Sequence, residues 1–164
     1  RGAEEHFEAL ADGPGDPRPA IAELVVRGCE GSVAVVAYSA SFEARCLEQL
    51  AVAVPGLGER LLAIRGRLVD LLPVVRNHVY HPEFRGSFSL KRVLPALVPE
   101  LTYEGLAVAQ GDVAAARIAG LMFAPPGPPE ERAEARRALL EYCKRDTLAM
   151  VRLLARLRAL ASSS

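Results

Sequence analysis

The sequence predicts a helix-rich α/β domain with a small sheet, and three observations carry this prediction. Ser32 to Tyr38 is a β-branched apolar run, typical of a strand that is buried on both faces of a parallel sheet. Ser41 to Val54 follows at once with apolar residues at near-helical spacing, so that strand, turn and helix form one α/β unit. After the breaker-rich segment Ala124 to Pro129, a further apolar pattern predicts one long final helix.

The elements before the Ser32 to Tyr38 strand are short. Glu4 to Leu10 could form a strand or the tail of one, and the turn-forming residues from Asp12 to Pro19 end it. Ala20 to Arg27 then fits a helix that Gly28 and Gly31 can stop. We therefore expect the β-branched run to be the central strand of the sheet.

Ser41 is a good N-cap for the helix that follows this strand, and Pro55 and Gly56 end that helix. Gly58 to Arg67 is predicted as another short helix. Leu68 to Val75 is an apolar stretch that contains Asp70, and Pro73 limits any strand there.

Two more helices precede the long final one. Ser89 can cap a helix from Leu90 to about Leu97, although Pro95 leaves its end open. Asp112 to Phe123 is predicted as a further helix because apolar residues recur along it.

Composition limits the class of protein. The 164 residues, 51% of them hydrophobic and 24% charged, suffice for a single domain, residues 1–164, with its own core. Lys+Arg 20 balance Asp+Glu 20, so a polyanion partner would need a local basic patch. Three cysteines without a paired zinc signature predict reduced thiols in a cytoplasmic protein. No apolar run approaches the roughly 20 residues that span a bilayer, so no membrane partner is expected.

Asp146 interrupts the apolar stripe of the final helix. At about 100° per residue its face is shared by Ala135, Leu139, Tyr142, Met150, Leu153, Leu157 and Leu160. An unpaired ionised carboxylate there is costly, so Asp146 must be neutral, tightly hydrogen-bonded or bound to a cation at the edge of the core. A cation would make Asp146 a binding site, whereas the alternatives are a buried structural acceptor and, for Tyr142, a core aromatic side chain.

Residues 142 to 146 read Tyr-Cys-Lys-Arg-Asp, and this Tyr-x3-Asp pattern resembles the third motif of the DEDDy exonucleases of the ribonuclease-H-like superfamily. Residues four apart on a helix face the same way, so the phenol and the carboxylate can converge on one point. The resemblance implies that Asp146 holds a divalent metal ion and that Tyr142 orients or activates the attacking water.

The predicted strand from Val33 to Tyr38 and the following Ser-Ala-Ser-Phe-Glu resemble the family's second motif, in which Phe-Asp opens a helix. Glu43 then takes the acidic position, with Glu in place of Asp, and Ser39 stands where Asn is common. Glu43 could instead serve only the helix macrodipole. The segments Val69 to Leu106 and Leu139 to Leu154 look like a bacterial domain of unknown function that is similar to these exonucleases.

The family's first motif, Asp-x-Glu on the first strand, has no counterpart here, because Glu4, Glu5 and Glu8 lack an apolar strand context. Together with the start at Arg1 rather than Met, this leads us to expect a C-terminal portion of a ribonuclease-H-like nuclease domain from a longer protein. Glu43 and Asp146 would bind Mg²⁺ or Mn²⁺ weakly without forming a two-metal clamp. We expect the isolated chain to be catalytically silent, with the remainder of the parent protein supplying the first motif.

Other polar residues are weaker candidates. Asp70 is predicted to be a structural residue, or to contact the residues of the site without binding the metal itself. His78 and His81 suggest a metal pair but lack a third ligand on a recognisable element. Four basic residues could contact nucleic acid, although solvated helix faces explain them equally well: Lys91, Arg92, Lys144 and Arg145.

The resemblance implies that the parent protein is a metal-dependent nuclease that hydrolyses phosphodiester bonds of DNA or RNA, exonucleolytically from the 3′ end. Two alternatives stay open. The first is a degenerate nuclease fold retained as a nucleic-acid-binding or protein-binding module. The second is an oligomerisation domain, because a sheet without its first strands exposes an edge that invites self-association.

Overall fold

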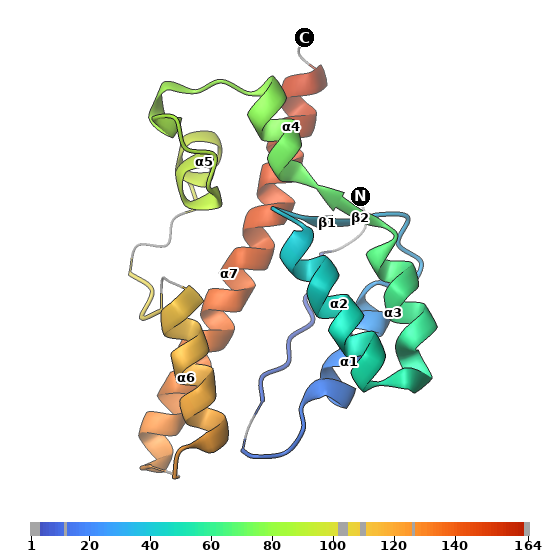
Figure 1. The fold of residues 1–164 in the computed structure, drawn as a ribbon. Helices are drawn as coiled ribbons and strands as arrows, with labels where there is room; N and C mark the ends of the chain where they lie inside the picture. The colour runs from blue at the N-terminus through green and yellow to red at the C-terminus, as the bar shows by residue number, and fades with distance from the viewer. Residues whose placement is uncertain (1–3, 12, 102–104, 109–110, 126, 163–164) are drawn as a thin grey trace.

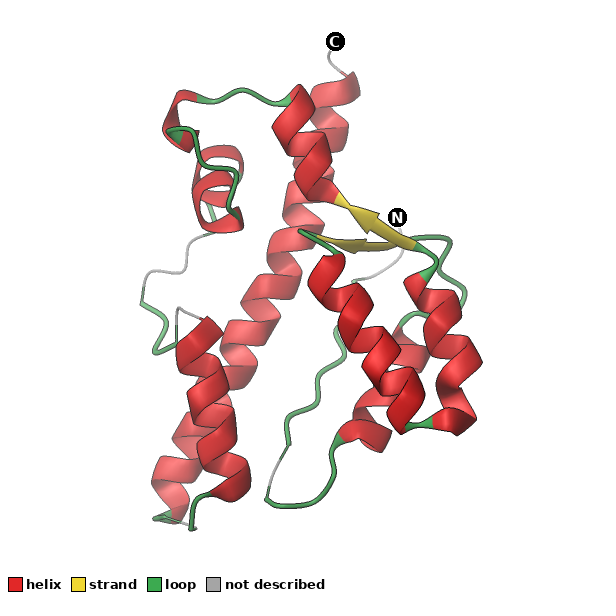
Figure 2. Cartoon of the chain, in the orientation of Figure 1, coloured by secondary structure: helices red, strands yellow, loops and turns green. Residues whose placement is uncertain are grey.

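The computed structural model describes residues 4–11, 13–101, 105–108, 111–125 and 127–162. The elements in chain order are α1 (Arg18–Gly28), β1 (Val35–Ala37), α2 (Ser41–Ala53), η1 (Pro55–Leu57), α3 (Gly58–Arg65), β2 (Leu68–Asp70), α4 (Leu71–His78), η2 (Pro82–Phe84), α5 (Leu90–Leu97), α6 (Gly111–Phe123) and α7 (Pro129–Ser162). Helices dominate and one small parallel sheet accompanies them, which confirms the helix-rich α/β prediction (Figure 2).

The 34-residue helix α7 runs through the length of the molecule (Figure 1). Helix α6 packs against its N-terminal half, and α5 packs against its C-terminal half. The sheet and the bundle formed by α1, α2 and α3 occupy another side of α7. No helix in the described part of the chain is both long and apolar enough to cross a membrane.

Strands β1 and β2 are parallel, with Val35 opposite Leu68 and Val36 opposite Val69. Successive side chains of a strand point to opposite faces. Accordingly, Val35 and Leu68 pack on the apolar cluster of α1, α2 and α3, whereas Val36 packs on the cluster shared by α4, α5 and α7. Both faces of β1 therefore meet apolar side chains.

The expected central position of the strand at Ser32 to Tyr38 is not seen in the described residues, where β1 pairs with β2 alone. The strand is also shorter than its apolar run, since Val33 is 94% exposed. β-Branched residues predict extended backbone, but an inter-strand ladder also needs a partner, and the ladder with β2 covers only Val35–Ala37.

The expected strand at Glu4 to Leu10 does not form, because side-chain contacts with helices hold this segment instead. The Arg27 guanidinium lies 5.4 Å from the centre of the Phe7 ring, and Leu10 joins the cluster between α6 and α7. Glu4 pairs with Arg152 at 3.0 Å. These contacts place the segment across the molecule rather than alongside a strand.

Asp70, rather than Ser41, accepts the backbone hydrogen bonds of the turn before α2. The helix starts at Ser41, and its N-cap residue, Ala40, has no side chain that could cap it. The Asp70 carboxylate accepts hydrogen bonds from the amides of Ser39 (2.8 Å) and Ala40 (3.0 Å), and also from Leu72 (2.9 Å) as the N-cap of α4. One acid thereby ties the end of β1 to the start of α4.

Two proline and serine predictions have different outcomes. Pro73 does limit the strand, and it lies in the first turn of α4, where a helix has no partner for the missing N–H. Ser89 occupies the N-cap position of α5, but its side chain makes no capping hydrogen bond. The three cysteines are free thiols.

Candidate functional site

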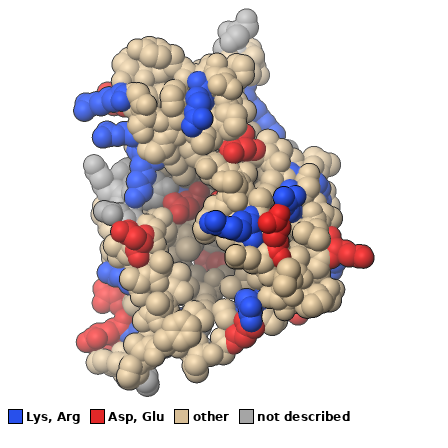
Figure 3. Space-filling model, in the orientation of Figure 1, with Lys and Arg blue, Asp and Glu red and all other residues tan. Residues whose placement is uncertain are grey.

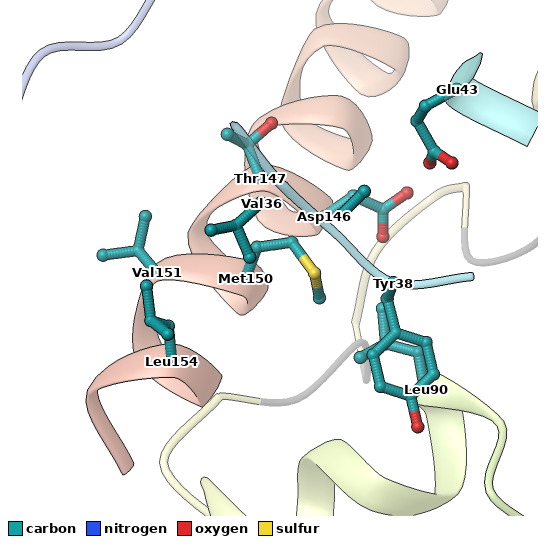
Figure 4. A pocket seen from close by; sticks show the side chains of 10 residues that line it. Val36, Tyr38, Glu43, Leu90, Asp146, Thr147, Met150, Val151 and Leu154 are labelled. Atoms are coloured by element: carbon teal, nitrogen blue, oxygen red, sulfur yellow. The ribbon is translucent and has the colours of Figure 1, made fainter. Parts of the chain in front are cut away.

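The two predicted acids meet in one pocket between β1, α2 and α7. We call it the carboxylate pocket; its volume is about 530 Å³. It is lined by Val36, Ala37, Tyr38, Glu43, Leu90, Asp146, Thr147, Met150, Val151 and Leu154. Figure 4 shows the side chains of Glu43 and Asp146 directed into the same space from opposite sides. The structure therefore brings together two acids that lie far apart in the sequence.

Glu43 lies in the first turn of α2, directly after the turn that Asp70 fixes. Its Oε2 atom is buried and has no hydrogen-bond partner within the described chain. A buried acceptor without a partner costs on the order of 1–3 kcal/mol, and more if it is charged. The macrodipole of α2 can favour the charge of Glu43, but it leaves this oxygen unsatisfied. A cation bound in the pocket would satisfy it.

Asp146 lies at the edge of the α7 stripe rather than within the fully buried core. The buried residues of α7 are Leu139, Ala149, Leu153 and Leu157, whereas Asp146 is only half-buried. From this edge, the Asp146 carboxylate points into the pocket (Figure 4). The helical period gave its direction correctly, but the depth of burial depends on which elements cover that part of α7.

Tyr142 supports Asp146 from one helical turn earlier. Burial, the negative charge of Asp146 and a hydrogen bond to Asp146 raise the pKa of Tyr142 to about 12. The phenol is therefore protonated at neutral pH and can donate to the carboxylate. Its hydroxyl is 3.8 Å from the position that a β-carbon on Gly111 would occupy. Tyr142 is not among the residues that line the pocket, and its contact with the site is through Asp146.

Two carboxylates from different elements fit a hard cation such as Mg²⁺ or Mn²⁺, which prefers oxygen ligands and often takes only one or two from protein side chains. The unsatisfied oxygen of Glu43 supports this fit. No group of three or more His, Cys, Asp or Glu residues within the described ranges is arranged to hold a metal ion. His81 instead accepts a backbone hydrogen bond from Glu83 at 3.3 Å.

The four basic candidates fall into two separate places. Lys91 and Arg92 directly follow Leu90, which lines the carboxylate pocket. Lys144 and Arg145 lie on other faces of α7, where Lys144 borders a groove with Glu8 and Arg145 is 3.6 Å from Glu141. None of the four is among the residues that line the carboxylate pocket in the described part of the chain.

Sequence reasoning missed Tyr38 as part of the pocket wall. Its hydroxyl donates to the backbone oxygen of Phe88 at 2.5 Å, which joins the end of β1 to the segment before α5. Burial, together with the charge of Asp70, raises its pKa to about 12. Its place at the end of the predicted strand, directly before the second motif, was the signal that could have indicated it.

A family model described as a domain of unknown function (DUF2779) matches residues 1–89, which is more than half of the chain. The matched region contains Glu43 and Asp70 and ends before α5, so Asp146 lies outside it. No curated protein and no solved structure gives a significant match.

Proposed function

This chain belongs to the DUF2779 family of domains of unknown function, and we propose that its carboxylate pocket is part of a metal-dependent nuclease site. The site would act on phosphodiester bonds of DNA or RNA within a ribonuclease-H-like fold. One observation carries this proposal: Glu43 and Asp146 line the same pocket, and a buried oxygen of Glu43 has no hydrogen-bond partner among the described residues. Each acid also occupies its position in a motif that resembles the DEDDy exonucleases.

The residues of this chain would divide the work as follows. Glu43 and Asp146 would hold Mg²⁺ or Mn²⁺, and the protonated hydroxyl of Tyr142 would fix the orientation of the Asp146 carboxylate. A bound ion would polarise a phosphoryl oxygen and make a coordinated water more acidic. Further ligands would come from water, substrate phosphate and the rest of the parent protein. Attack from the 3′ end follows from the resemblance to the exonucleases.

The test is Mn²⁺ binding to the whole chain, followed by paramagnetic broadening of NMR signals. We expect the Met150 methyl signal to broaden strongly, because this side chain lines the pocket beside Asp146. Glu43→Gln and Asp146→Asn should each weaken the broadening. Glu48→Gln is the matched control. Glu48 is an exposed acid on α2, the helix that carries Glu43, and it pairs with Arg65 outside the pocket. Equal broadening in Asp146→Asn and the wild type would refute the metal site.

A nucleic-acid-binding module without hydrolysis is the second candidate. Exposed Lys and Arg side chains gather over α4, α5 and the loops beside them (Figure 3). We call these residues the basic patch: Arg76, Arg85, Lys91 and Arg92. Oligonucleotide binding that persists in EDTA, in a chain whose pocket does not bind Mn²⁺, would favour this candidate over the nuclease.

A further inference from the structure

A second groove adjoins the carboxylate pocket, and we propose that it binds a backbone phosphate of a single-stranded nucleic acid. The groove has a volume of about 540 Å³. We call it the phosphate groove; it is lined by Tyr38, Ser39, Leu72, Arg76 and residues 86–90. The identity of the ligand as substrate rests on the proposed nuclease function, whereas the phosphate chemistry of the groove does not.

Arg76 supplies the positive charge of the groove. Its guanidinium lies 6.0 Å from the centre of the Phe88 ring, so a cation–π contact holds it beside the groove. No carboxylate in the described part of the chain forms an ion pair with it. A planar guanidinium whose donors are not taken by a carboxylate matches the oxygens of a phosphate.

Two serine hydroxyls add neutral polar groups to the wall of the groove. The Oγ atoms of Ser87 and Ser89 are 3.3 Å apart, and both residues line the groove. Ser89 makes no side-chain bond to the helix that it precedes, so α5 does not consume its hydroxyl. Gly86 adopts a left-handed conformation with φ of 78°, which shapes the loop that carries the serines.

No carboxylate among the described residues lines the groove. Asp70 lies behind Ser39, but its carboxylate accepts from the three backbone amides of residues 39, 40 and 72. Glu43 and Asp146 line only the neighbouring pocket. Among the described residues, Arg76 is therefore the only one with a charged side chain that lines the phosphate groove, and its charge favours an anion.

The groove and the carboxylate pocket are direct neighbours, because Tyr38 and Leu90 line both. The hydrogen bond from Tyr38 to Phe88 fixes the boundary between them. A strand whose scissile phosphate occupies the carboxylate pocket could thus place a neighbouring phosphate against Arg76. This arrangement would position the substrate without requiring Arg76 to contact the reacting atoms.

The experiment measures binding of a short oligothymidylate to the whole chain in EDTA, with thymidine monophosphate and inorganic phosphate as separate probes. Arg76→Ala should weaken oligonucleotide binding about tenfold, the loss expected for one charge-assisted contact. The slope of log affinity against log salt should become shallower by about 0.7. Arg60→Ala is the control. Arg60 is an exposed arginine that does not line the groove, and its guanidinium lies 3.5 Å from the carboxylate of Glu30. Unchanged binding in Arg76→Ala, or an equal loss in Arg60→Ala, would overturn the proposal.

Two further measurements separate this proposal from the metal site and from misfolding. The double variant Ser87→Ala, Ser89→Ala retains the charge of Arg76 and should still weaken oligonucleotide binding, by about threefold. The Mn²⁺ broadening of Met150 should be unchanged in Arg76→Ala, which also shows that the variant is folded. Loss of the Met150 broadening in Arg76→Ala would contradict a phosphate groove that is separate from the metal site. If inorganic phosphate alone bound as tightly as the oligonucleotide, a strand-binding role would be refuted.

Discussion

Asp70 organises the segments around the carboxylate pocket by accepting three backbone hydrogen bonds, two from the turn before α2 and one from the first turn of α4. Asp70→Ala leaves these amides without their partner, and hydrogen bonds to a charged acceptor are stronger than neutral ones. We expect a loss of about 2–3 kcal/mol in the free energy of unfolding, measured by urea denaturation. Glu30→Ala, which removes an exposed acid from a surface pair, should change it by less than about 0.5 kcal/mol.

Ser39 carries backbone strain in the same turn. Its φ is 62°, a left-handed conformation that Asn tolerates better than Ser. We expect Ser39→Asn to stabilise the chain by about 0.5 kcal/mol in the same denaturation experiment. Ser41→Asn is the control, because Ser41 is the first helical residue of α2 and should gain nothing. A destabilised Ser39→Asn would show that this turn depends on the smaller side chain.

The phenol of Tyr142 predicts a pH dependence of stability. Its pKa is raised from 10 to about 12, first by burial and then by Asp146. The protonated phenol therefore stabilises the folded chain fully below about pH 10, and this contribution is lost as the pH rises towards 12. Urea denaturation at about pH 9 and about pH 11 should show a smaller loss of stability in Tyr142→Phe than in the wild type. The same loss in both would show that Tyr142 titrates normally.

Sequence patterns single out the two acids that line the carboxylate pocket, but not the rest of its wall. Asp146 and Glu43 were identified because each stands at a fixed spacing within a local motif, and helical geometry directs the side chain. Tyr38 and Leu90 line the pocket only because α5 packs on α7 and the hydroxyl of Tyr38 reaches Phe88. Such contacts join distant segments, and no local pattern encodes them.

At the scale of elements, the helices were easier to predict than the strands because an apolar repeat marks a helix over several turns. Each strand has only three residues in its ladder, so flanking β-branched residues extended the prediction beyond the real ends of β1. The strand predicted at Glu4 to Leu10 does not form, for a related reason. Phe7 and Leu10 pack against helices, and so short a segment has too few apolar residues to distinguish these contacts from a sheet face.

Helix α7 contributes to stability through the side chains that it buries, and Leu153 is one of them. Leu153 is fully buried in the cluster with α4 and α5, so Leu153→Ala should lower the free energy of unfolding by about 3 kcal/mol, as expected for a cavity in a packed core. Val151→Ala, on the same helix but 41% exposed, should change it by less than about 1 kcal/mol. Denaturation curves of both variants test this contrast, and similar losses would contradict the packing described here.

At the scale of the whole molecule, the buried apolar residues of the described ranges form three clusters rather than one. One lies among α1, α2 and α3, a second joins α4 and α5 to the C-terminal half of α7, and a third joins α6 to the N-terminal half of α7. Counting the described residues alone, the third has the fewest buried members: Val108, Ala114, Leu121 and Leu139. Regions with few buried contacts open at a lower free energy than the rest of a protein.

The pairing of α6 with α7 should therefore be the first part to open. Hydrogen exchange should show weaker protection for the amides of α6 than for those of α3, whose Leu61 and Ile64 are buried in the cluster with α1 and α2. Leu121→Ala should accelerate exchange in α6 and leave α3 unchanged, since the two clusters share no residue. If exchange in α3 accelerated equally, the molecule would open as one cooperative unit. Because Tyr142 packs against the third cluster, local opening there would also release the support of Asp146.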